Sequence, residues 1–519
     1  MSGSAASPAT GRDRLRILFC VALAALVLLP GLGRASLWWD ECHSVGMARA
    51  VLERTPAEVA DALAHGVSPY FVLLAPIARD GVPDGWLRLP SVLAALALVV
   101  VAAGIGRDLG GAGLAWRVGL ATAVSPFIAW HAREVRWYTL AWLLAALSLR
   151  YGLRAARGAG GRSLALSIGW GLLAAMVFSP AIVLLPPIFL LGIGAARSGR
   201  AAAEVSTAAL PRRRWLTAGA IGSIVVVAGV WFWRVLLAPS LHGGAAGLGF
   251  SNLGQLSAAS LAYTGVAMAT GYTVGPGPIE WHHDPPSMPS PGEAILMGGA
   301  GLVLAVLFLR GLLVLRRTAS GRAALLLLAQ SLLPVLALAA AAVWTGHKFA
   351  PRHAGLIAIP VIVLAAAGTS RTTEGRRWPS IAGAILLLVQ GLSLVQLHAS
   401  PRYLREQVRD AADYVDRVAT SDDLVLVFGG IDLPWKYYDH GRVPSRVVYP
   451  DDPATWSPAS MPGILEGHAR VVIVRGTVLE DPRDAPLLDA VTGRSRMETS
   501  ARFPGLVVEV RTLEGAGTP

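Results

Sequence analysis

Long apolar segments alternate with short polar ones over the first 400 residues of the chain. Apolar runs of about 17 to 23 residues recur, the length an α-helix needs to cross roughly 30 Å of hydrocarbon. The pattern predicts a polytopic α-helical membrane domain over residues 1–400, with about 11 spans. We place the spans at residues 17–32, 86–106, 114–130, 137–153, 163–178, 181–193, 215–237, 294–315, 323–344, 354–368 and 381–397.

The pattern changes to that of a soluble domain after residue 400. Residues 404–418 have the spacing of an amphipathic helix, and three short apolar runs, 424–428, 471–474 and 506–511, are typical of buried strands. We therefore expect a small α/β domain over residues 401–519. It contains no glycine-rich phosphate loop and no metal-ligand spacing, so we expect it to select or position an acceptor rather than to catalyse.

Composition and charge support a membrane protein and indicate its orientation. The chain of 519 residues is 54% hydrophobic and 15% charged, with a formal net charge of +12. Its arginines gather in every second loop, for example at 150–162 and 316–322, so the positive-inside rule accounts for the charge and nucleic-acid binding is not supported. This rule predicts a cytoplasmic N-terminus, with residues 34–85, 131–136, 238–293 and the tail on the opposite side. Residues 69–78 are apolar but too short to span, and predict an external interfacial helix.

Two acidic residues follow the first apolar run directly. Residues 37–44 read LWWDECHS, which places Asp40 and Glu41 beside two indoles at an external membrane edge. Indoles favour the headgroup level, and carboxylates there point to chemistry at that edge. A solvated loop pair is the alternative interpretation.

A second charged cluster lies between two predicted spans on the same external side. Residues 131–138 read HAREVRWY and include Glu134, Arg136 and Tyr138. A charged side chain deep in a helix costs roughly 3 kcal/mol on insertion scales, so this density indicates a wet cavity or mutual pairing. A headgroup-level anchor is the alternative for this motif alone.

The order of the motifs resembles a known family. After the Asp40-Glu41 pair come HGVSPY at 65–70, RLPS at 88–91, SPF at 125–127 and REVRWY at 133–138. This arrangement is similar to bacterial membrane glycosyltransferases of the GT-C superfamily, and above all to glycosyltransferase family 39, the protein O-mannosyltransferase and lipid A aminoarabinose transferase group. The chain departs from that pattern at His65-Gly66, where the family has His-Pro-Pro, and at Arg352-His353, where it has Arg-Tyr.

The resemblance implies an activity and a cellular location. The reaction would be hexosyl or pentosyl transfer from a polyprenyl-phosphate-linked donor to a lipid, glycan or protein acceptor, at the outer face of a bacterial inner membrane. Such a displacement needs a carboxylate to take the acceptor proton and cations to hold the departing phosphate.

The site expected from the resemblance has three groups of residues. We expect Asp40 to be the base, with Glu41 positioning it or binding the acceptor and Glu134 orienting nearby groups. The phosphate would be held by Arg136, Arg352 and Lys348, and the substrate would be contacted by His65, Tyr70 and Tyr138. No cofactor is expected, because arginines can replace a cation beside a single lipid-linked phosphate. The run WHHD at 281–284 offers metal-ligand types, but we predict no metal there.

A transporter or flippase of a lipid-linked or anionic substrate is the main alternative function, since intramembrane charges also mark substrate paths. Transporters usually show paired half-repeats with charges near the midplane. Here the charges collect on one side, and a soluble domain follows on that same side. A non-catalytic assembly or sensor protein is the third possibility, but it leaves both charged clusters unexplained.

Overall fold

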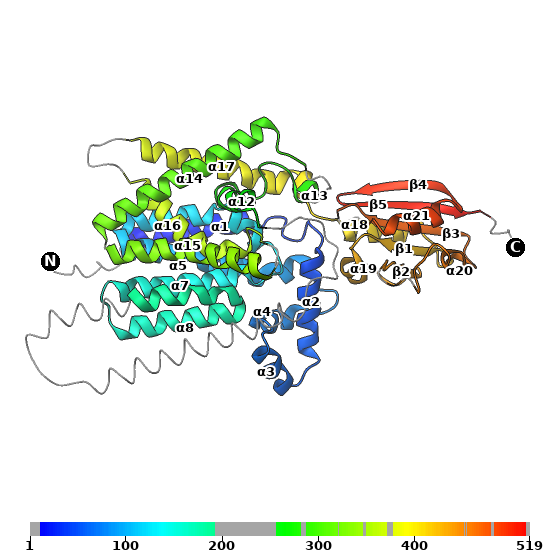
Figure 1. The fold of residues 1–519 in the computed structure, drawn as a ribbon, viewed down its shortest axis with the longest axis horizontal. Helices are drawn as coiled ribbons and strands as arrows, with labels where there is room; N and C mark the ends of the chain where they lie inside the picture. Colours follow the sequence, from blue (N-terminus) through cyan, green and yellow to red (C-terminus); the bar gives the residue numbers. More distant parts are fainter. Residues whose placement is uncertain are drawn as a thin grey trace, which may run out of the picture.

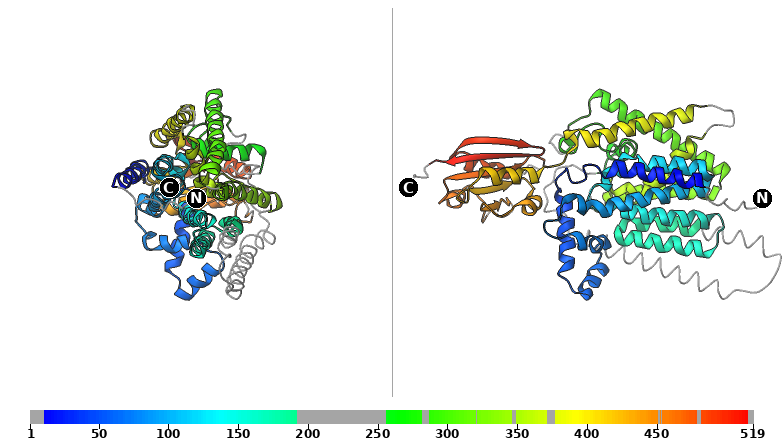
Figure 2. Two further views of the ribbon diagram at one scale, coloured as in Figure 1. Left: turned by 90° about the vertical axis from the view of Figure 1, so that its left-hand side faces the viewer. Right: turned by 180° about the vertical axis from the view of Figure 1, so that it is seen from behind.

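The computed structural model describes residues 11–191, 256–281, 287–319, 321–345, 349–370, 377–450, 452, 454–478 and 482–514. Within this part, a bundle of helices and a small sheet lie at opposite ends of the long axis of the molecule (Figure 1). Three short helices, α2 (Trp39–Leu52), α3 (Pro56–Ala64) and α4 (Pro69–Leu74), lie between them, and the view from behind shows the same order (Figure 2).

The first half of the bundle follows the predicted apolar runs closely. Its helices are α1 (Gly11–Leu28), α5 (Asp84–Ala123), α6 (Pro126–Ala132), α7 (Tyr138–Ala156) and α8 (Gly161–Val177), followed by the 3-10 helix η2 (Ser179–Leu184). Residues Tyr70, Phe71 and Leu74 of α4 are buried, as a helix that lies against the bundle requires.

Helix α5 consists of two helical segments that pack against each other. Its backbone is non-helical at Gly110 and Gly111, and Gly111 has a φ of +69°, which a residue with a side chain adopts only with strain. A Cβ at Gly106 would lie 2.9 Å from the Leu114 carbonyl oxygen, so the segments approach closely beside this turn. The two segments correspond to the predicted spans 86–106 and 114–130. The second ends early because Ser125 and Pro126 begin α6, where the Ser125 hydroxyl accepts the Ile128 N–H.

The second half of the bundle contains helices that the sequence analysis predicted and two that it did not. The described elements are α12 (Ala258–Thr270), α13 (Pro278–Trp281), α14 (Pro291–Thr318), α15 (Gly321–Thr345), η4 (His353–Ile357), α16 (Ala358–Gly368) and α17 (Trp378–Ala399). Helices α14 and α16 touch through Gly311 and Gly368, where a Cβ would overlap a backbone carbonyl of the other helix. Helices α12 and α13 lie in the region 238–293, which the sequence analysis treated as an external loop.

Four helices of the described part are long and apolar enough to cross a bilayer: α5, α14, residues Gly321–Val343 of α15, and α17. Shorter apolar helices cover Gly161–Val177, Ser179–Leu191 and His353–Gly368. The chain is thus a multi-pass membrane protein. The total of about 11 spans stays a prediction, and its span at 215–237 lies outside the described residues.

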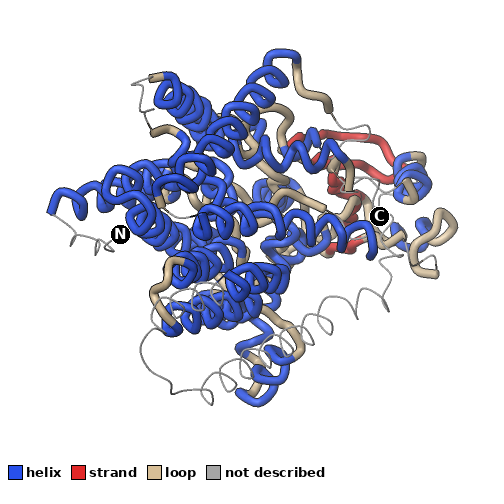
Figure 3. Tube along the Cα trace, turned by 60° about the vertical axis from the view of Figure 1, so that its left-hand side comes forward, coloured by secondary structure: helices blue, strands red, loops and turns tan. Residues whose placement is uncertain are grey.

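The tail is a small α/β unit, and among the described residues strands occur only there (Figure 3). Its elements are η5 (Pro401–Tyr403), α18 (Val408–Val418), β1 (Leu424–Phe428), α19 (Asp432–Tyr438), β2 (Ser445–Val447), α20 (Met461–Leu465), β3 (Arg470–Gly476), α21 (Asp484–Thr492), β4 (Ser495–Phe503) and β5 (Leu506–Leu513). The strand order is β2-β1-β3-β5-β4, with β1 parallel to β2 and β3, and β5 antiparallel to β3 and β4.

The sheet is buried on both faces at its centre, and one face continues into the membrane domain. Leu424, Leu426 and Phe428 face a core that includes residues of α20 and α21. Val425 and Val427 face a core shared with α18, α19, α2 and α4. The tail is therefore packed onto α2 and α4 rather than held by a linker alone.

Candidate active site

Glu41 joins three separate parts of the chain. Its carboxylate is 1% exposed and lies in the first turn of α2, where the helix dipole favours a negative charge. Arg88 of α5 donates to Oε1 from Nε at 2.9 Å and to Oε2 from Nη2 at 2.8 Å, and the Val135 backbone N–H donates to Oε1 at 2.7 Å. Both oxygens of this carboxylate accept structural hydrogen bonds, which hold α2, α5 and the loop after α6 together.

Arg88 also fixes the segment that enters α2. Its Nη1 donates to the carbonyl oxygens of Leu32 at 2.7 Å and Ala35 at 3.0 Å, and its Nη2 donates to that of Ser36 at 3.1 Å. The guanidinium is buried with every contact directed to protein oxygens. The segment 32–36 is thereby held a few residues ahead of Asp40.

Asp40 is adjacent in sequence but differently placed. Its side chain is 21% exposed, and within the described part its carboxylate has one ion pair, a long one of 3.8 Å from Oδ2 to Nη2 of Arg136. Arg136 Nη1 also donates to the Asp40 carbonyl oxygen at 3.2 Å. The Asp40 carboxylate is therefore partly open and loosely paired, unlike that of Glu41.

Glu134 is a buried carboxylate with two charged or chargeable neighbours. His131 Nδ1 lies 3.0 Å from its Oε2, and Arg405 of the tail donates to its Oε1. Burial would raise the pKa of the Glu134 carboxyl, but Arg405 and His131 outweigh it and hold that pKa well below its ordinary value. Glu134 is therefore ionised and paired. The other ring nitrogen of His131, Nε2, lies 3.1 Å from the Tyr272 hydroxyl.

Arg136 and Arg352 each carry a buried Nε without a hydrogen-bond partner among the described residues. The Arg136 guanidinium lies 3.9 Å from the Trp137 ring centroid, and that of Arg352 lies 6.0 Å from the Trp38 ring. Buried polar groups are usually paired, so these donors are open to an acceptor that the described residues do not supply. Lys348, the third predicted phosphate ligand, lies outside the described residues.

The structure brings two of the three predicted substrate contacts to this cluster. Tyr70 is buried, and its hydroxyl lies 3.0 Å from Ser91 Oγ, which donates to the Arg136 carbonyl oxygen at 2.8 Å. The Tyr138 ring lies 5.3 Å from the His131 ring and 5.6 Å from the Arg136 guanidinium. His65 is 75% exposed at the end of α3, and its Nδ1 lies 3.3 Å from Asp61 Oδ1. Its polar contacts are thus with its own helix.

Two residues of the cluster were missed by sequence reasoning. Arg405 lies in a stretch predicted to be helical, but α18 begins only at Val408, so the extended connector before it carries Arg405 to Glu134. Tyr272 follows α12, in a region without a charged motif. No local signal in the sequence marks either residue as part of the site.

A cavity of about 250 Å³ lies beside the Glu134–Arg405 pair. It is bounded by the end of α1, the end of α6 and the connector after α17, and its lining includes Arg34, Trp130, Glu134, His398, Tyr403 and Arg405. Such a space accommodates a headgroup-sized ligand, somewhat below the size of most small-molecule pockets.

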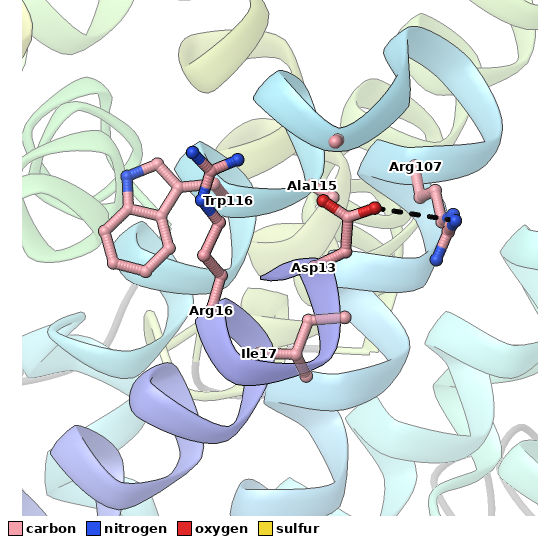
Figure 4. A pocket seen from close by; sticks show the side chains of 7 residues that line it. Asp13, Arg16, Ile17, Arg107, Ala115 and Trp116 are labelled. Atoms are coloured by element: carbon pink, nitrogen blue, oxygen red, sulfur yellow. Dashed lines mark ion pairs between the residues drawn. The ribbon is translucent and has the colours of Figure 1, made fainter. Parts of the chain in front are cut away.

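A second pocket lies between the start of α1 and the turn of α5 and is too small for a substrate. Its volume is about 10 Å³, barely what one water molecule needs. Figure 4 shows Asp13 pointing toward Arg107, with 3.8 Å between Oδ2 and Nη2. This pocket is a helix contact, and the cluster around Asp40 is the candidate site.

Solved structures share this architecture. The chain is similar to ArnT from Cupriavidus metallidurans bound to undecaprenyl phosphate, with a TM-score of 0.53 and 14% identity over 95% of this chain and 97% of that one. The apo form of the same protein gives a TM-score of 0.52 and 14% identity over 96% and 98% of the two chains. No protein-family model matches the sequence, and no curated protein matches it either. At this identity the likeness shows the fold alone, and that fold is the one of the GT-C glycosyltransferase ArnT, the lipid A aminoarabinose transferase, as the motifs in the first 140 residues predict.

Proposed function

We propose that this protein is a membrane glycosyltransferase in which Asp40 is the general base. It would move a sugar from a polyprenyl-phosphate-linked donor to an acceptor hydroxyl at the extracytoplasmic face. One observation carries the assignment of the base. Glu41 and Glu134 are each neutralised by an arginine at hydrogen-bond distance, whereas Asp40 is partly exposed and, among the described residues, has a single ion pair of 3.8 Å.

The proposed step is a single displacement at the anomeric carbon. The acceptor oxygen forms a bond to that carbon while the bond from the carbon to the phosphate oxygen breaks, and polyprenyl phosphate leaves with the electron pair. Asp40 takes the proton of the acceptor hydroxyl. Arg136 and Arg352, whose buried Nε donors have no protein partner in the described part, meet the charge on the departing phosphate, with Lys348 as a third cation.

The remaining residues would shape the site rather than react. Glu41 places Asp40 through the Arg88 and Val135 contacts, and Glu134 orients His131 and Arg405. Tyr70 supports the backbone of Arg136 through Ser91, and the Tyr138 ring packs beside the Arg136 guanidinium. His65, exposed and paired with Asp61, is left out of this assignment.

The choice of donor is supported by the fold and by the basic character of the site. ArnT, which shares the fold over nearly its whole length, was solved with undecaprenyl phosphate bound. A lipid-linked phosphate is an anion delivered from the bilayer, which suits arginines at the end of a helix bundle. We expect hexosyl or pentosyl donors and a lipid, glycan or protein acceptor.

The proposed location is the bacterial inner membrane, with the N-terminus in the cytoplasm and the tail outside. Helix α2, which carries Asp40 and Glu41, and the tail lie at one end of the bundle (Figure 1). Asp108, beside the turn of α5, accepts from Arg150 Nε at 2.9 Å and from Arg154 Nε at 2.9 Å. These arginines lie in the last turns of α7, in a region that the positive-inside rule assigns to the cytoplasm.

The test of this function is transfer by Asp40→Asn compared with the parent protein. Asparagine keeps the shape and removes the proton affinity, so turnover of polyprenyl-phosphate hexosyl and pentosyl donors should fall by about 10² to 10⁴ fold. Binding of polyprenyl phosphate should change little. Asp61→Asn, an exposed carboxylate on α3, is the matched control and should transfer like the parent.

Near-parent turnover in Asp40→Asn would remove Asp40 from the role of base. A parent protein that neither transfers from any of these donors nor binds polyprenyl phosphate would end the transferase assignment itself.

A further inference from the structure

Arg405 belongs to the tail side of the chain, yet its side chain lies within the candidate site. It sits in the connector between α17 and α18 (residues 400–407) and pairs with the buried Glu134. Its guanidinium lies 3.9 Å from the Trp38 ring centroid and 5.1 Å from that of Trp130. Two indoles and a carboxylate thus hold this cation, and one of the indoles, Trp38, lies two residues before Asp40 in the sequence.

The connector itself is anchored, so Arg405 is held firmly in this position. Gln407 Nε2 donates to the Arg405 carbonyl oxygen at 2.8 Å, and the Gln407 backbone N–H donates to the Pro504 carbonyl oxygen at 3.0 Å. The Ser36 backbone N–H donates to Gln407 Oε1 at 3.3 Å. The connector is therefore tied both to the sheet of the tail and to the segment that leads into α2.

One edge of the Arg405 guanidinium is not used by the protein. Nη2 donates to Glu134, while Nη1 is buried and has no hydrogen-bond partner among the described residues. The same is true of the Nε groups of Arg136 and Arg352. Arg352 approaches the Trp38 ring, as Arg405 does, so both guanidinium groups lie near one indole. Unpaired guanidinium donors that gather in one buried place indicate an acceptor with several oxygens.

The charges of the cluster also call for an anion. Arg88, Arg136, Arg352 and Arg405 bring positive charge, and Asp40, Glu41 and Glu134 are carboxylates that face them. Asp84 also acts on Arg88, but it is paired with Arg409, so that pair adds no net charge. Arg88 neutralises the charge of Glu41, and Arg405 neutralises that of Glu134. One carboxylate, Asp40, is left for Arg136 and Arg352. A buried excess of cations is stable only when an anion compensates it.

We propose that Arg405 is a ligand of the donor phosphate and that the tail, through this connector, completes the donor site. The proposal rests on the proposed function and extends it, because it gives the tail a part in donor binding besides a part in acceptor binding. Glu134 holds one edge of the guanidinium, and the other edge donates to a phosphate oxygen. The cavity of about 250 Å³ lined by Arg405, Trp130 and Tyr403 is the space by which a headgroup reaches it.

The test is titration of the purified full-length protein with polyprenyl phosphate. Arg405→Ala should weaken binding by about 10- to 100-fold, the usual worth of hydrogen bonds to a charged group. Arg405→Lys keeps the charge but loses the planar, two-pronged donor geometry of the guanidinium. It should therefore bind more tightly than Arg405→Ala and more weakly than the parent. Arg402→Ala is the matched control, since Arg402 lies in the same connector, is 40% exposed and pairs with Glu280 and Glu293. It should bind like the parent.

A second pair of variants distinguishes a loss of binding from misfolding. This is needed because Arg405→Ala leaves the Glu134 charge buried without its arginine partner. Glu134→Gln removes that charge, so Glu134→Gln with Arg405→Ala is compared with Glu134→Gln alone. The double variant should again bind polyprenyl phosphate about 10- to 100-fold more weakly.

Each outcome has a distinct meaning. A parent protein that binds no polyprenyl phosphate contradicts the proposed function. A parent that binds, together with Arg405 variants that bind equally well in both backgrounds, overturns the role of Arg405 and leaves the function intact.

Discussion

The hydroxyl of Tyr438, in the tail, donates to Oδ2 of Asp84, at the start of α5, at 2.6 Å. The same hydroxyl accepts the Leu37 backbone N–H at 2.6 Å, and Arg409 Nη1 donates to Asp84 Oδ2 at 3.0 Å. Burial, followed by the Asp84 charge, raises the pKa of Tyr438 far above its ordinary value, so the hydroxyl remains a donor at physiological pH. The tail thus holds the segment that runs into Asp40 from one side, while Arg88 holds it from the other.

Removal of this hydroxyl should loosen the contact between the tail and the membrane domain. Tyr438→Phe leaves the Leu37 N–H without its acceptor and Asp84 without one donor, which should lower the free energy of unfolding by about 1 to 3 kcal/mol. Thermal unfolding of the purified protein measures the loss. Tyr437→Phe is the control, since Tyr437 packs its ring against Tyr438 and Arg49. Equal stability of the two variants would show that the hydroxyl contacts contribute nothing.

The Glu41–Arg88 pair should be far more costly to break than an exposed pair. Arg88→Ala leaves a buried carboxylate unpaired and should destabilise the protein by about 3 to 5 kcal/mol. The double variant Glu41→Gln with Arg88→Met removes both charges and should recover part of the loss. Asp80→Asn, which breaks the exposed ion pair with Arg49, should unfold at the parent temperature. A melting temperature for Arg88→Ala near that of the parent would contradict the structural role of the pair.

Arg136 should contribute geometry as well as charge to phosphate binding. Its guanidinium stacks on Trp137 and has a buried Nε without a protein partner in the described part. Arg136→Lys keeps the charge and loses the planar fork, so polyprenyl phosphate should bind about 10-fold more weakly, and Arg136→Ala should lose more. If both variants bind like the parent, Arg136 is an interfacial anchor and the phosphate is held elsewhere.

Orientation can be tested with reporter fusions at two places. At residue 519 we expect activity from a reporter that works only after export, because the tail would lie outside. A reporter that works only in the cytoplasm should be inactive there. At Gly160, in the turn between α7 and α8, we expect the reverse: activity from a reporter that works only in the cytoplasm, and none from one that needs export. A cytoplasmic signal from residue 519 would reverse the scheme and move the candidate site to the other face.

The sequence predicts much of the bundle because apolar length is a local property. The described parts of the predicted spans coincide with helices, and even the short run 69–78 appears as α4 and the 3-10 helix η1 (Ala75–Ile77). The strands β1, β3 and β5 were predicted by their apolar runs. Strand β4 was missed because it is an edge strand whose residues are mostly exposed, and β2 because it has three residues.

The sequence predicts which segments form the candidate site, but not which residue of each segment takes which role. Adjacent residues of a helix point about 100° apart, so Glu41 can face Arg88 while Asp40 faces outward, and no pattern in the sequence decides which does so. The part played by Arg405 depends on a helix that begins at Val408 instead of 404 and on tertiary contacts across the chain. Such contacts follow from packing rather than from local sequence.

The bond between Ser36 and Gln407 has a consequence for how the protein matures during its synthesis. These residues are 371 positions apart, so at about 5 to 20 residues per second the ribosome needs about 20 to 75 s to supply the second after the first. During that interval α2, which carries Asp40, lacks the contacts with the tail that fix the segment before it. Nascent chains would therefore be inert toward substrate until the last quarter of the polypeptide has docked, and activity would begin only with a completed molecule.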